Sequence, residues 1–94
     1  MRFGSFRNRE LERFWRYGET RGVARRYEAK LRAMLTVIEE AETVKELDTI
    51  PGWRFHPLKG DRRGVWSLKL THNQRLTFRI DGTVVSEIDI EDYH

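Results

Sequence analysis

Three histidines are the residues of this sequence best suited to move protons, because histidine ordinarily titrates near pH ~6.5. They are His56, His72 and His94, and no two of them lie within four positions of each other. The chain has no cysteine, no serine-nucleophile motif, no glycine-rich phosphate loop and no helical histidine pair at metal spacing. Nothing in the spacing of histidines and carboxylates supports a metal site, so we expect neither a metal nor a cofactor. Acid–base catalysis beside positive charge is the chemistry that remains.

RNA cleavage without a metal is a reaction that needs such residues. A base deprotonates the ribose 2′-hydroxyl, which attacks the adjacent phosphorus, while an acid protonates the leaving 5′-oxygen and cations stabilise the phosphorane. His56 and His94 flank a basic segment, and either could carry the proton. Three cations could bind the phosphate, since arginine can bind two of its oxygens at once: Lys59, Arg75 and Arg79. Tyr93 could stack on a base or donate its phenol proton, or it could only cover a strand.

The distribution of charge favours a polyanionic partner. The 94 residues carry a net charge of +3, with 18 Lys and Arg against 15 Asp and Glu, and the pI is about 9.6. Residues 1–32 and 53–79 each carry +6, residues 33–52 carry −4 and residues 80–94 carry −5. Arginines clustered in this way favour nucleic acid, and the alternative is a basic surface that is only solvated.

The composition excludes several classes of protein. With 38% apolar residues the chain can form one core, and its length suits a single domain over residues 1–94. No run approaches the ~18 consecutive apolar residues that cross a bilayer, and the first residues lack the pattern of a signal peptide. The absence of cysteine suits a reducing compartment. We therefore expect a cytoplasmic domain that makes no contact with a membrane.

The first half of the chain predicts a short strand and two helices. Residues 2–6 suit a strand, and residues 9–17 suit a helix that ends before Gly18. A longer helix is expected from about Val23 to Ala41, where apolar residues recur at helical spacing. These residues are Tyr27, Leu31, Met34, Leu35 and Ile38. One side of this helix should therefore lie in the core.

The second half changes to the alternating pattern of strands. The expected strands are residues 53–56, 65–71 and 75–80, and a last strand that contains Val84, Ile88 and Ile90. Asp81-Gly82, between the last two, is typical of a hairpin turn. The sequence therefore predicts an α+β fold, in which helices pack on one face of an antiparallel sheet of about three to four strands.

Strand alternation also gathers positive charge on the sheet face that points away from the helices. That face should carry Arg54, His56, Lys69, Arg75 and Arg79. A one-sided accumulation across three strands could form a shallow surface that attracts phosphates, and we favour this interpretation over a solvated surface without a ligand.

Four ordered motifs in the second half carry a family resemblance. They are His56-Pro57-Leu58-Lys59-Gly60-Asp61-Arg62-Arg63-Gly64, Trp66-Ser67, Asn73-Gln74-Arg75-Leu76-Thr77-Phe78 and Glu91-Asp92-Tyr93-His94. With this spacing the chain resembles the HigB toxins, the plasmid-maintenance branch of the RelE superfamily of bacterial toxin–antitoxin proteins. Phe3-Gly4-Ser5-Phe6 and Leu11-Glu12-Arg13-Phe14 also fit, so the resemblance covers nearly the whole chain and implies a RelE-like fold.

The resemblance implies a ribosome-dependent endoribonuclease. Such an enzyme cuts messenger RNA in the decoding site of the 30S subunit, beside 16S rRNA, and so inhibits translation. The resemblance also implies neutralisation by a helix-turn-helix antitoxin of the HigA type, with contact to operator DNA only through the toxin–antitoxin complex. The competing interpretation is a weakly active or non-catalytic toxin-like module, kept for antitoxin binding and operon regulation. The complete terminal Asp-Tyr-His motif argues against that alternative.

Matched residue by residue, the resemblance implies two sets of site residues. The catalytic set is His56, Arg75, Asp92, Tyr93 and His94. His94 helped by Asp92 could be the base with His56 as the alternative proton carrier, and the acid and base roles can be exchanged. The set that binds RNA or phosphate is Arg54, Lys59, Lys69, Asn73 and Arg79. Gln74 stands where relatives commonly have an aromatic residue, which argues against base stacking at that position.

Overall fold

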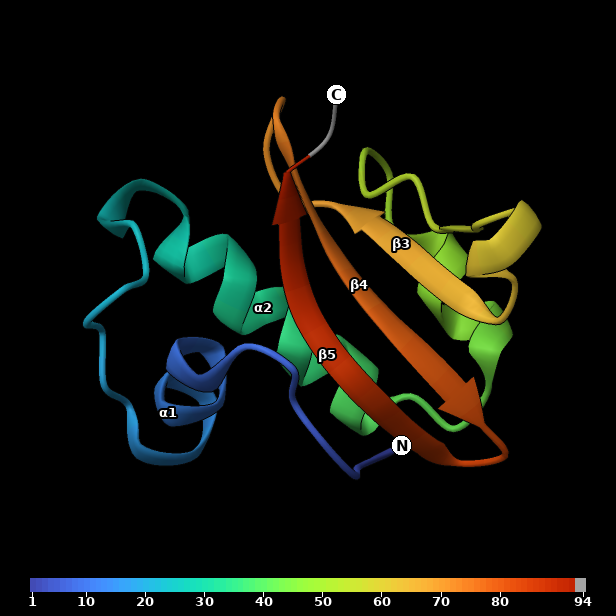
Figure 1. The fold of residues 1–94 in the computed structure, drawn as a ribbon, viewed down its shortest axis with the longest axis horizontal. Coiled ribbons are helices and arrows are strands. Elements are labelled where there is room, and N and C mark those ends of the chain that lie inside the picture. The colour runs from blue at the N-terminus through green and yellow to red at the C-terminus, as the bar shows by residue number, and fades with distance from the viewer. Residues whose placement is uncertain (93–94) are drawn as a thin grey trace.

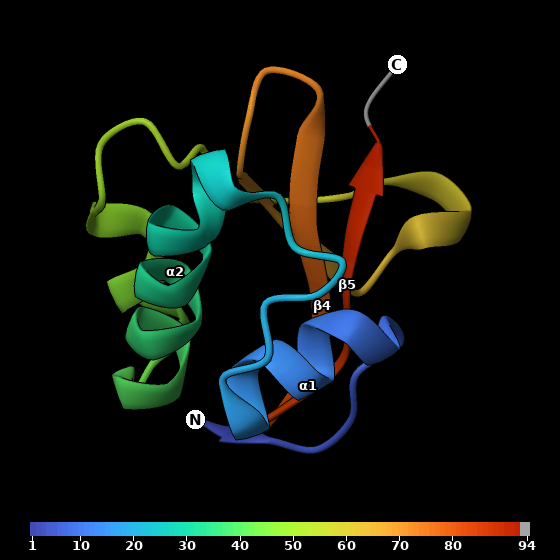
Figure 2. The same cartoon turned by 90° about the vertical axis from the view of Figure 1, so that its left-hand side faces the viewer.

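The computed structural model describes residues 1–92, which form a layer of helices against a sheet (Figures 1 and 2). The helical layer contains α1 (Arg9–Tyr17) and α2 (Glu28–Glu40), with 3-10 helices at Arg25–Tyr27 and Val44–Thr49. The five strands, in their order across the sheet, are β1 (Arg2–Phe3), β5 (Val84–Asp92), β4 (Gln74–Asp81), β3 (Val65–Lys69) and β2 (His56–Pro57). The loop between β2 and β3 contains a further 3-10 helix, Gly60–Arg62. Within residues 1–92, no helix combines the length and the apolar character needed to cross a membrane.

The predicted α+β class is confirmed, although the sheet is mixed. Strands β2 to β5 pair in antiparallel fashion, as expected. Strand β1 pairs in parallel with β5, with Arg2 opposite Val84, and Phe6 adds an isolated bridge to Ile88. The strand expected at residues 2–6 is therefore two short contacts with β5. A parallel pair needs a long connection between its strands, which the helices and the rest of the sheet provide.

Helix α1 has the bounds that the sequence predicts. The side chain of Asn8 accepts a hydrogen bond from the main-chain N–H of Leu11 at 3.0 Å and so caps the first turn. Gly18 ends the helix in the left-handed region at φ 73°, where a residue without a Cβ is favoured. Leu11 and Phe14 are buried on the side that packs against the sheet.

Helix α2 begins later than the sequence suggested. The expected start near Val23 is wrong, because Gly22 adopts a φ of 85° and the chain then forms a 3-10 turn before the α-helix begins at Glu28. The predicted apolar stripe is nevertheless confirmed, since all of its residues are buried: Tyr27, Leu31, Met34, Leu35 and Ile38. Burying each such side chain stabilises the fold by roughly 1.5–3 kcal/mol.

The core lies between this stripe and one face of the sheet. The sheet contributes Leu68, Leu76, Phe78, Val85 and Ile88, and Leu70 follows directly after β3; all are almost wholly buried. The rings of Phe55 and Trp66 stack at 4.6 Å along the margin of the core. Figure 2 shows α2 on one side of the strands and the loop that contains Gly60–Arg62 on the other. The helices therefore leave one face of the sheet to the polar residues.

Two strands depart from the predicted pattern, each at a residue with a positive φ. Arg54 has a φ of 50°, so only His56–Pro57 joins the ladder and the predicted strand over residues 53–56 is largely wrong. Glu87 has a φ of 52° at an irregularity in the pairing of β4 with β5. This bulge changes the alternation along β5. As a result Val85 is fully buried and Val84 only partly.

Candidate active site

Two rows of polar residues cross the open face of the sheet. From β2 to β5, the first row of directly opposed residues is His56, Ser67, Thr77 and Asp89. From β3 to β5, the second row is Lys69, Arg75 and Glu91. Opposed residues in a ladder point to the same face. The register of four strands therefore brings together side chains that are distant in the sequence. The largest separation, between His56 and Glu91, is 35 positions.

Two hollows of about 280 Å³ each open on this face. The first, called here the His56 hollow, is lined by His56, Leu58, Arg62, Arg75, Thr77, Glu91 and Asp92. The second, called here the basic hollow, is lined by Arg54, Lys69, Thr71, His72 and Arg75. Because Arg75 borders both, the two hollows adjoin along β4.

The position of Arg75 is defined by a neighbouring strand. Its Nη1 donates a hydrogen bond to Oγ of Ser67 at 3.3 Å. Ser67 is fully buried and lies opposite His56 in the pairing of β2 with β3. The guanidinium therefore leans along the sheet toward the strand that holds the histidine.

The ring of His56 is oriented by the main chain. Its Nδ1 lies 2.7 Å from the carbonyl oxygen of Arg54. A carbonyl oxygen can only accept, so Nδ1 carries the hydrogen in this contact and Nε2 is the atom left to exchange a proton. Arg54, whose carbonyl accepts this hydrogen, itself has a φ of 50° in the left-handed region.

Glu91 is an anion on this face, close to the end of β5. Its Oε2 accepts hydrogen bonds from Nη2 of Arg62 at 2.7 Å and from the hydroxyl of Thr77 at 2.5 Å. The bond from Arg62, helped by that from Thr77, holds the pKa of Glu91 below its ordinary value of 4.5. Glu91 is therefore ionised at neutral pH, and its charge is balanced by Arg62.

The two aspartates of β5 have different surroundings. Burial, with a contribution from Glu91, raises the pKa of Asp89 above its ordinary value of 3.8, although Oδ1 accepts a hydrogen bond from the N–H of Ile90. Asp92 is exposed at the end of the strand, where its Oδ1 accepts from Nε2 of Gln74 at 3.4 Å. Gln74 thus provides Asp92 with a hydrogen-bond partner. Within residues 1–92, no three His, Asp or Glu side chains gather closely enough to hold a metal ion.

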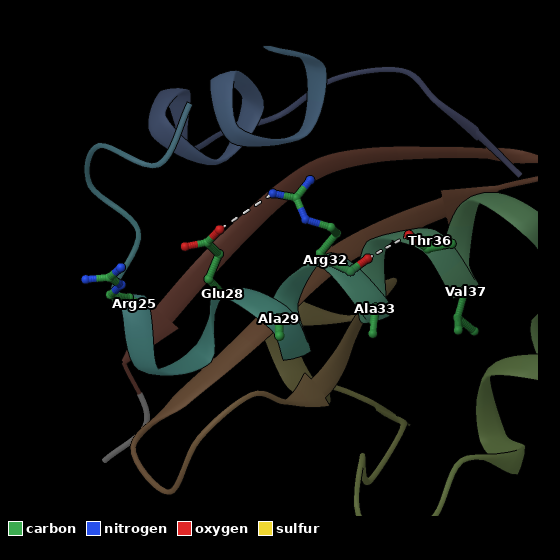
Figure 3. A pocket seen from close by; sticks show the side chains of 7 residues that line it. All are labelled: Arg25, Glu28, Ala29, Arg32, Ala33, Thr36 and Val37. Atoms are coloured by element: carbon green, nitrogen blue, oxygen red, sulfur yellow. Dashed lines mark hydrogen bonds and ion pairs between the residues drawn. The ribbon is translucent and has the colours of Figure 1, made fainter. Parts of the chain in front are cut away.

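A larger hollow, of about 640 Å³, lies on the outer side of α2 (Figure 3). Its wall is formed by small side chains, among them Ala29 and Ala33, and by the ion pair of Arg32 with Glu28 at 3.8 Å. It belongs to the helical layer, on the other side of the sheet from His56, and holds none of the residues that the sequence places in a site.

Comparison with known proteins identifies the family. Residues 4–94 match the sequence family described as the RelE-like toxin of the type II toxin–antitoxin system HigB. This chain belongs to the HigB-like toxins. It is 33% identical over 90 residues to the protein named Endoribonuclease HigB of Proteus vulgaris, covering 96% of this chain and 97% of that one. The resemblance drawn from the four motifs is confirmed.

Solved structures confirm the fold of this HigB-like toxin. A YoeB/ParE toxin from Agrobacterium tumefaciens superimposes with a TM-score of 0.63 at 17% identity, covering 100% of both chains. The YoeB-YefM complex from Staphylococcus aureus matches with a TM-score of 0.58 at 16% identity, covering 100% of this chain and 99% of that one. At these identities the likeness concerns the fold alone, and it is the predicted RelE-like fold.

The structure brings five of the ten expected site residues of the HigB-like toxin to the two hollows. His56, Arg75 and Asp92 border the His56 hollow, while Arg54 and Lys69 border the basic hollow. Two further catalytic candidates, Tyr93 and His94, lie outside the described residues.

Three expected phosphate ligands lie apart from these hollows. Nε of Arg79 forms an ion pair with Glu87 at 3.0 Å, and Arg79 borders a smaller hollow of about 40 Å³. Lys59 and Asn73 are exposed in the loops before β3 and before β4, and neither lines the two larger hollows of the face. Their assignment to RNA binding remains a prediction.

Sequence reasoning gave no site role to four residues of this face: Arg62, Ser67, His72 and Thr77. Glu91 stands in the terminal motif that the sequence indicated, but its partner was not predicted. The polar positions of the alternating strands were the available signal for Ser67 and Thr77. Nothing in the spacing of Arg62 and Glu91, which are 29 positions apart, indicates that they form an ion pair. The acidic residues of β5 also make the face less basic than the three strands before it suggested.

Proposed function

We propose that this HigB-like toxin, an endoribonuclease like its Proteus relative, cuts messenger RNA held in the decoding site of the ribosome and so stops translation. The observation that carries the proposal is that His56 and Arg75 border one hollow on the open face of the sheet. A proton carrier beside a guanidinium is the minimum that attack by a 2′-hydroxyl requires. One domain over residues 1–94, acting in the cytoplasm, carries this activity.

The proton steps use the ring of His56. With Nδ1 donating to the carbonyl oxygen of Arg54, Nε2 exchanges the proton with the RNA. The family motif adds His94, helped by Asp92, as the partner in these steps, and Tyr93 as the residue that orients the scissile nucleotide. Which histidine removes the proton from the 2′-hydroxyl and which protonates the 5′-oxygen follows from the placement of the bound RNA.

The charge on the phosphorane is stabilised by Arg75. An arginine can hold two phosphate oxygens at once, and Arg75 stands where the His56 hollow meets the basic hollow. Arg54 and Lys69 in the basic hollow bind the phosphate of a neighbouring nucleotide. Lys59, Asn73 and Arg79 contribute at the periphery, where they contact messenger RNA or 16S rRNA of the 30S subunit.

The ribosome holds the RNA in a fixed orientation, which the two hollows of the toxin do not do by themselves. Both hollows are shallow and lie on an open sheet face, so an isolated RNA strand is held there only by charge. A messenger RNA already fixed in the decoding site presents its phosphate in one orientation, which lowers the entropy cost of the reaction. A helix-turn-helix antitoxin of the HigA type neutralises the toxin, and the toxin reaches operator DNA only through the complex of the two.

Primer extension on messenger RNA after induction tests the proposal, with Arg75→Ala, His94→Ala and the control Arg32→Ala. Arg32 lies on α2, on the other side of the sheet, so its replacement removes an equal charge away from the hollow. Arg75→Ala and His94→Ala should lose the cleavage products, and Arg32→Ala should keep them. Cleavage that is undiminished in both site variants would remove this site from the mechanism, whereas the absence of cleavage by the wild type would favour the non-catalytic, antitoxin-binding module.

Deletion of residues 92–94 provides a second test of the same site. Because Ile90 is the last apolar residue of β5 that packs against the core, the truncated protein should keep its fold. Growth arrest on expression should disappear while circular dichroism remains that of the full chain. A truncated protein that still arrests growth would remove the terminal motif from the mechanism.

A further inference from the structure

The loop between β2 and β3 brings a second arginine to the His56 hollow, beside Arg75. This loop lies over the open face of the sheet, opposite α2 (Figure 2). From it Arg62 reaches the His56 hollow, whose wall it shares with His56 and Arg75. The next residue, Arg63, is exposed and lines neither this hollow nor the basic hollow. Two adjacent arginines of one loop are thus directed differently.

The direction of Arg62 is set by Glu91. Nη2 of Arg62 lies 2.7 Å from Oε2 of Glu91, and the same oxygen accepts a hydrogen bond from the hydroxyl of Thr77. Thr77 lies within the paired central strand β4 and is only 3% exposed, so it cannot move with the loop. The side chain of Glu91 is 29% exposed against 43% for Arg62, so the carboxylate is the more enclosed partner. The contacts therefore run from the rigid sheet, through Glu91, to a guanidinium at the mouth of the hollow.

We infer that Arg62 binds the phosphate of the RNA together with Arg75, and that Glu91 is the positioning residue that holds Arg62 there. A guanidinium has five N–H donors in a rigid plane, so the bond to Glu91 leaves donors for a second anion. This inference rests on the proposed function, because it concerns the same hollow and the same reaction.

The charges of the hollow favour this role. A carboxylate in a phosphate-binding surface repels the substrate unless a cation compensates it. Glu91 is ionised and would place such a charge beside His56 and Arg75 if Arg62 were absent. With Arg62 in place, the guanidinium groups of Arg62 and Arg75 compensate the two acidic side chains that border the hollow, Glu91 and Asp92, so the hollow does not repel a phosphate.

The test is single-turnover cleavage of ribosome-bound messenger RNA with toxin in excess, comparing Arg62→Ala with Arg63→Ala. The two variants remove the same charge from the same loop. Arg62→Ala should lower the saturated rate by about tenfold to a hundredfold, as removal of one preorganised donor does. Arg63→Ala should change only the toxin concentration that gives half of that rate. Arg62→Lys, which keeps the charge without the planar donors, should recover part of the rate.

Glu91→Gln tests the positioning role. Glutamine keeps the size of the side chain and can still accept from Thr77, but it loses the charge that holds Arg62. The saturated rate should fall, although less than in Arg62→Ala, and the double variant should cleave no more slowly than Arg62→Ala alone. Circular dichroism at the assay temperature establishes that each variant is folded. Independent, additive losses from Glu91→Gln and Arg62→Ala would contradict the inference.

Equal saturated rates for wild type, Arg62→Ala and Arg63→Ala would show that the pair only fastens the loop, and would overturn the inference while leaving the proposed function intact. The proposed function fails in a different way, since wild-type toxin would then not cut ribosome-bound RNA or Arg75→Ala would cut it normally. The two failures are therefore distinguished within one experiment.

Discussion

Nη1 of Arg75 and Oγ of Ser67 lie 3.3 Å apart, joining β4 to the residue of β3 that stands opposite His56. Sheet register alone pairs Arg75 with Lys69. The hydrogen bond draws the guanidinium along the strands by one step on the same face, toward the histidine. Replacing this buried hydroxyl therefore tests directly how Arg75 is oriented in the site.

Ser67→Ala should therefore weaken cleavage without unfolding the protein. A hydrogen bond contributes about 0.5–1.5 kcal/mol, so the rate on ribosomes should fall roughly twofold to tenfold. Ser86→Ala on β5, opposite Arg79, removes an equivalent hydroxyl and should leave the rate unchanged. Single-turnover kinetics of both variants measure this, and equal rates for the two would mean that Ser67 does not orient Arg75.

Glu91→Gln should change how the stability of the fold depends on pH. Because the folded pKa of Glu91 is depressed below 4.5, its ionisation stabilises the fold above that pH, and this contribution is lost as pH falls through the folded pKa. The wild type should therefore lose stability below about pH 4.5 more steeply than Glu91→Gln. Urea unfolding between pH 3 and pH 7 measures the difference, and parallel curves would contradict it.

Asp89→Asn should change the pH dependence of stability in the opposite direction. Burial raises the pKa of Asp89 above 3.8, so its ionised form opposes folding at pH values above the folded pKa. The amide keeps an oxygen that can accept from the N–H of Ile90. The variant should be more stable than wild type at pH 7, and the difference should vanish as pH falls below 3.8. Lower stability of the variant at pH 7 would show that the charge of Asp89 is favourable in the fold.

The sequence could predict the elements whose pattern is local. Helix α1 with its end at Gly18, and the buried stripe of α2 from Tyr27 to Ile38, follow from periodicity and capping. The sequence motifs likewise predicted that His56 and Arg75 share a site, and the register of β2, β3 and β4 brings both to one hollow.

The features that the sequence did not predict depend on long-range contacts. The positive φ of Arg54 and Glu87 is rare for residues with a Cβ, and it is stabilised by tertiary structure rather than by their own preferences. The parallel pairing of β1 with β5 joins the two ends of the described chain. The Arg62–Glu91 pair likewise depends on where the loop before β3 lies on the sheet.

Two substitutions at Arg54 separate its backbone from its charge. Both Arg54→Gly and Arg54→Ala remove the cation from the basic hollow, so both should weaken cleavage to the same extent. Glycine tolerates the φ of 50°, whereas alanine pays about 1–2 kcal/mol there, partly offset by the entropy of glycine. Arg54→Gly should therefore be the more stable of the two in urea unfolding. Equal stability would indicate that the left-handed conformation is not retained in solution.

The central claim is that His56 takes part in cleavage by a 2′-hydroxyl, and the most direct test measures the ends of the products. Wild-type toxin and His56→Ala are incubated with ribosomes that carry messenger RNA, and formation of 2′,3′-cyclic phosphate ends is followed with time. Wild type should produce these ends, and His56→Ala should produce them about 10²- to 10⁴-fold more slowly. Wild-type rates from His56→Ala, or products that end in a 3′-hydroxyl, would contradict the mechanism.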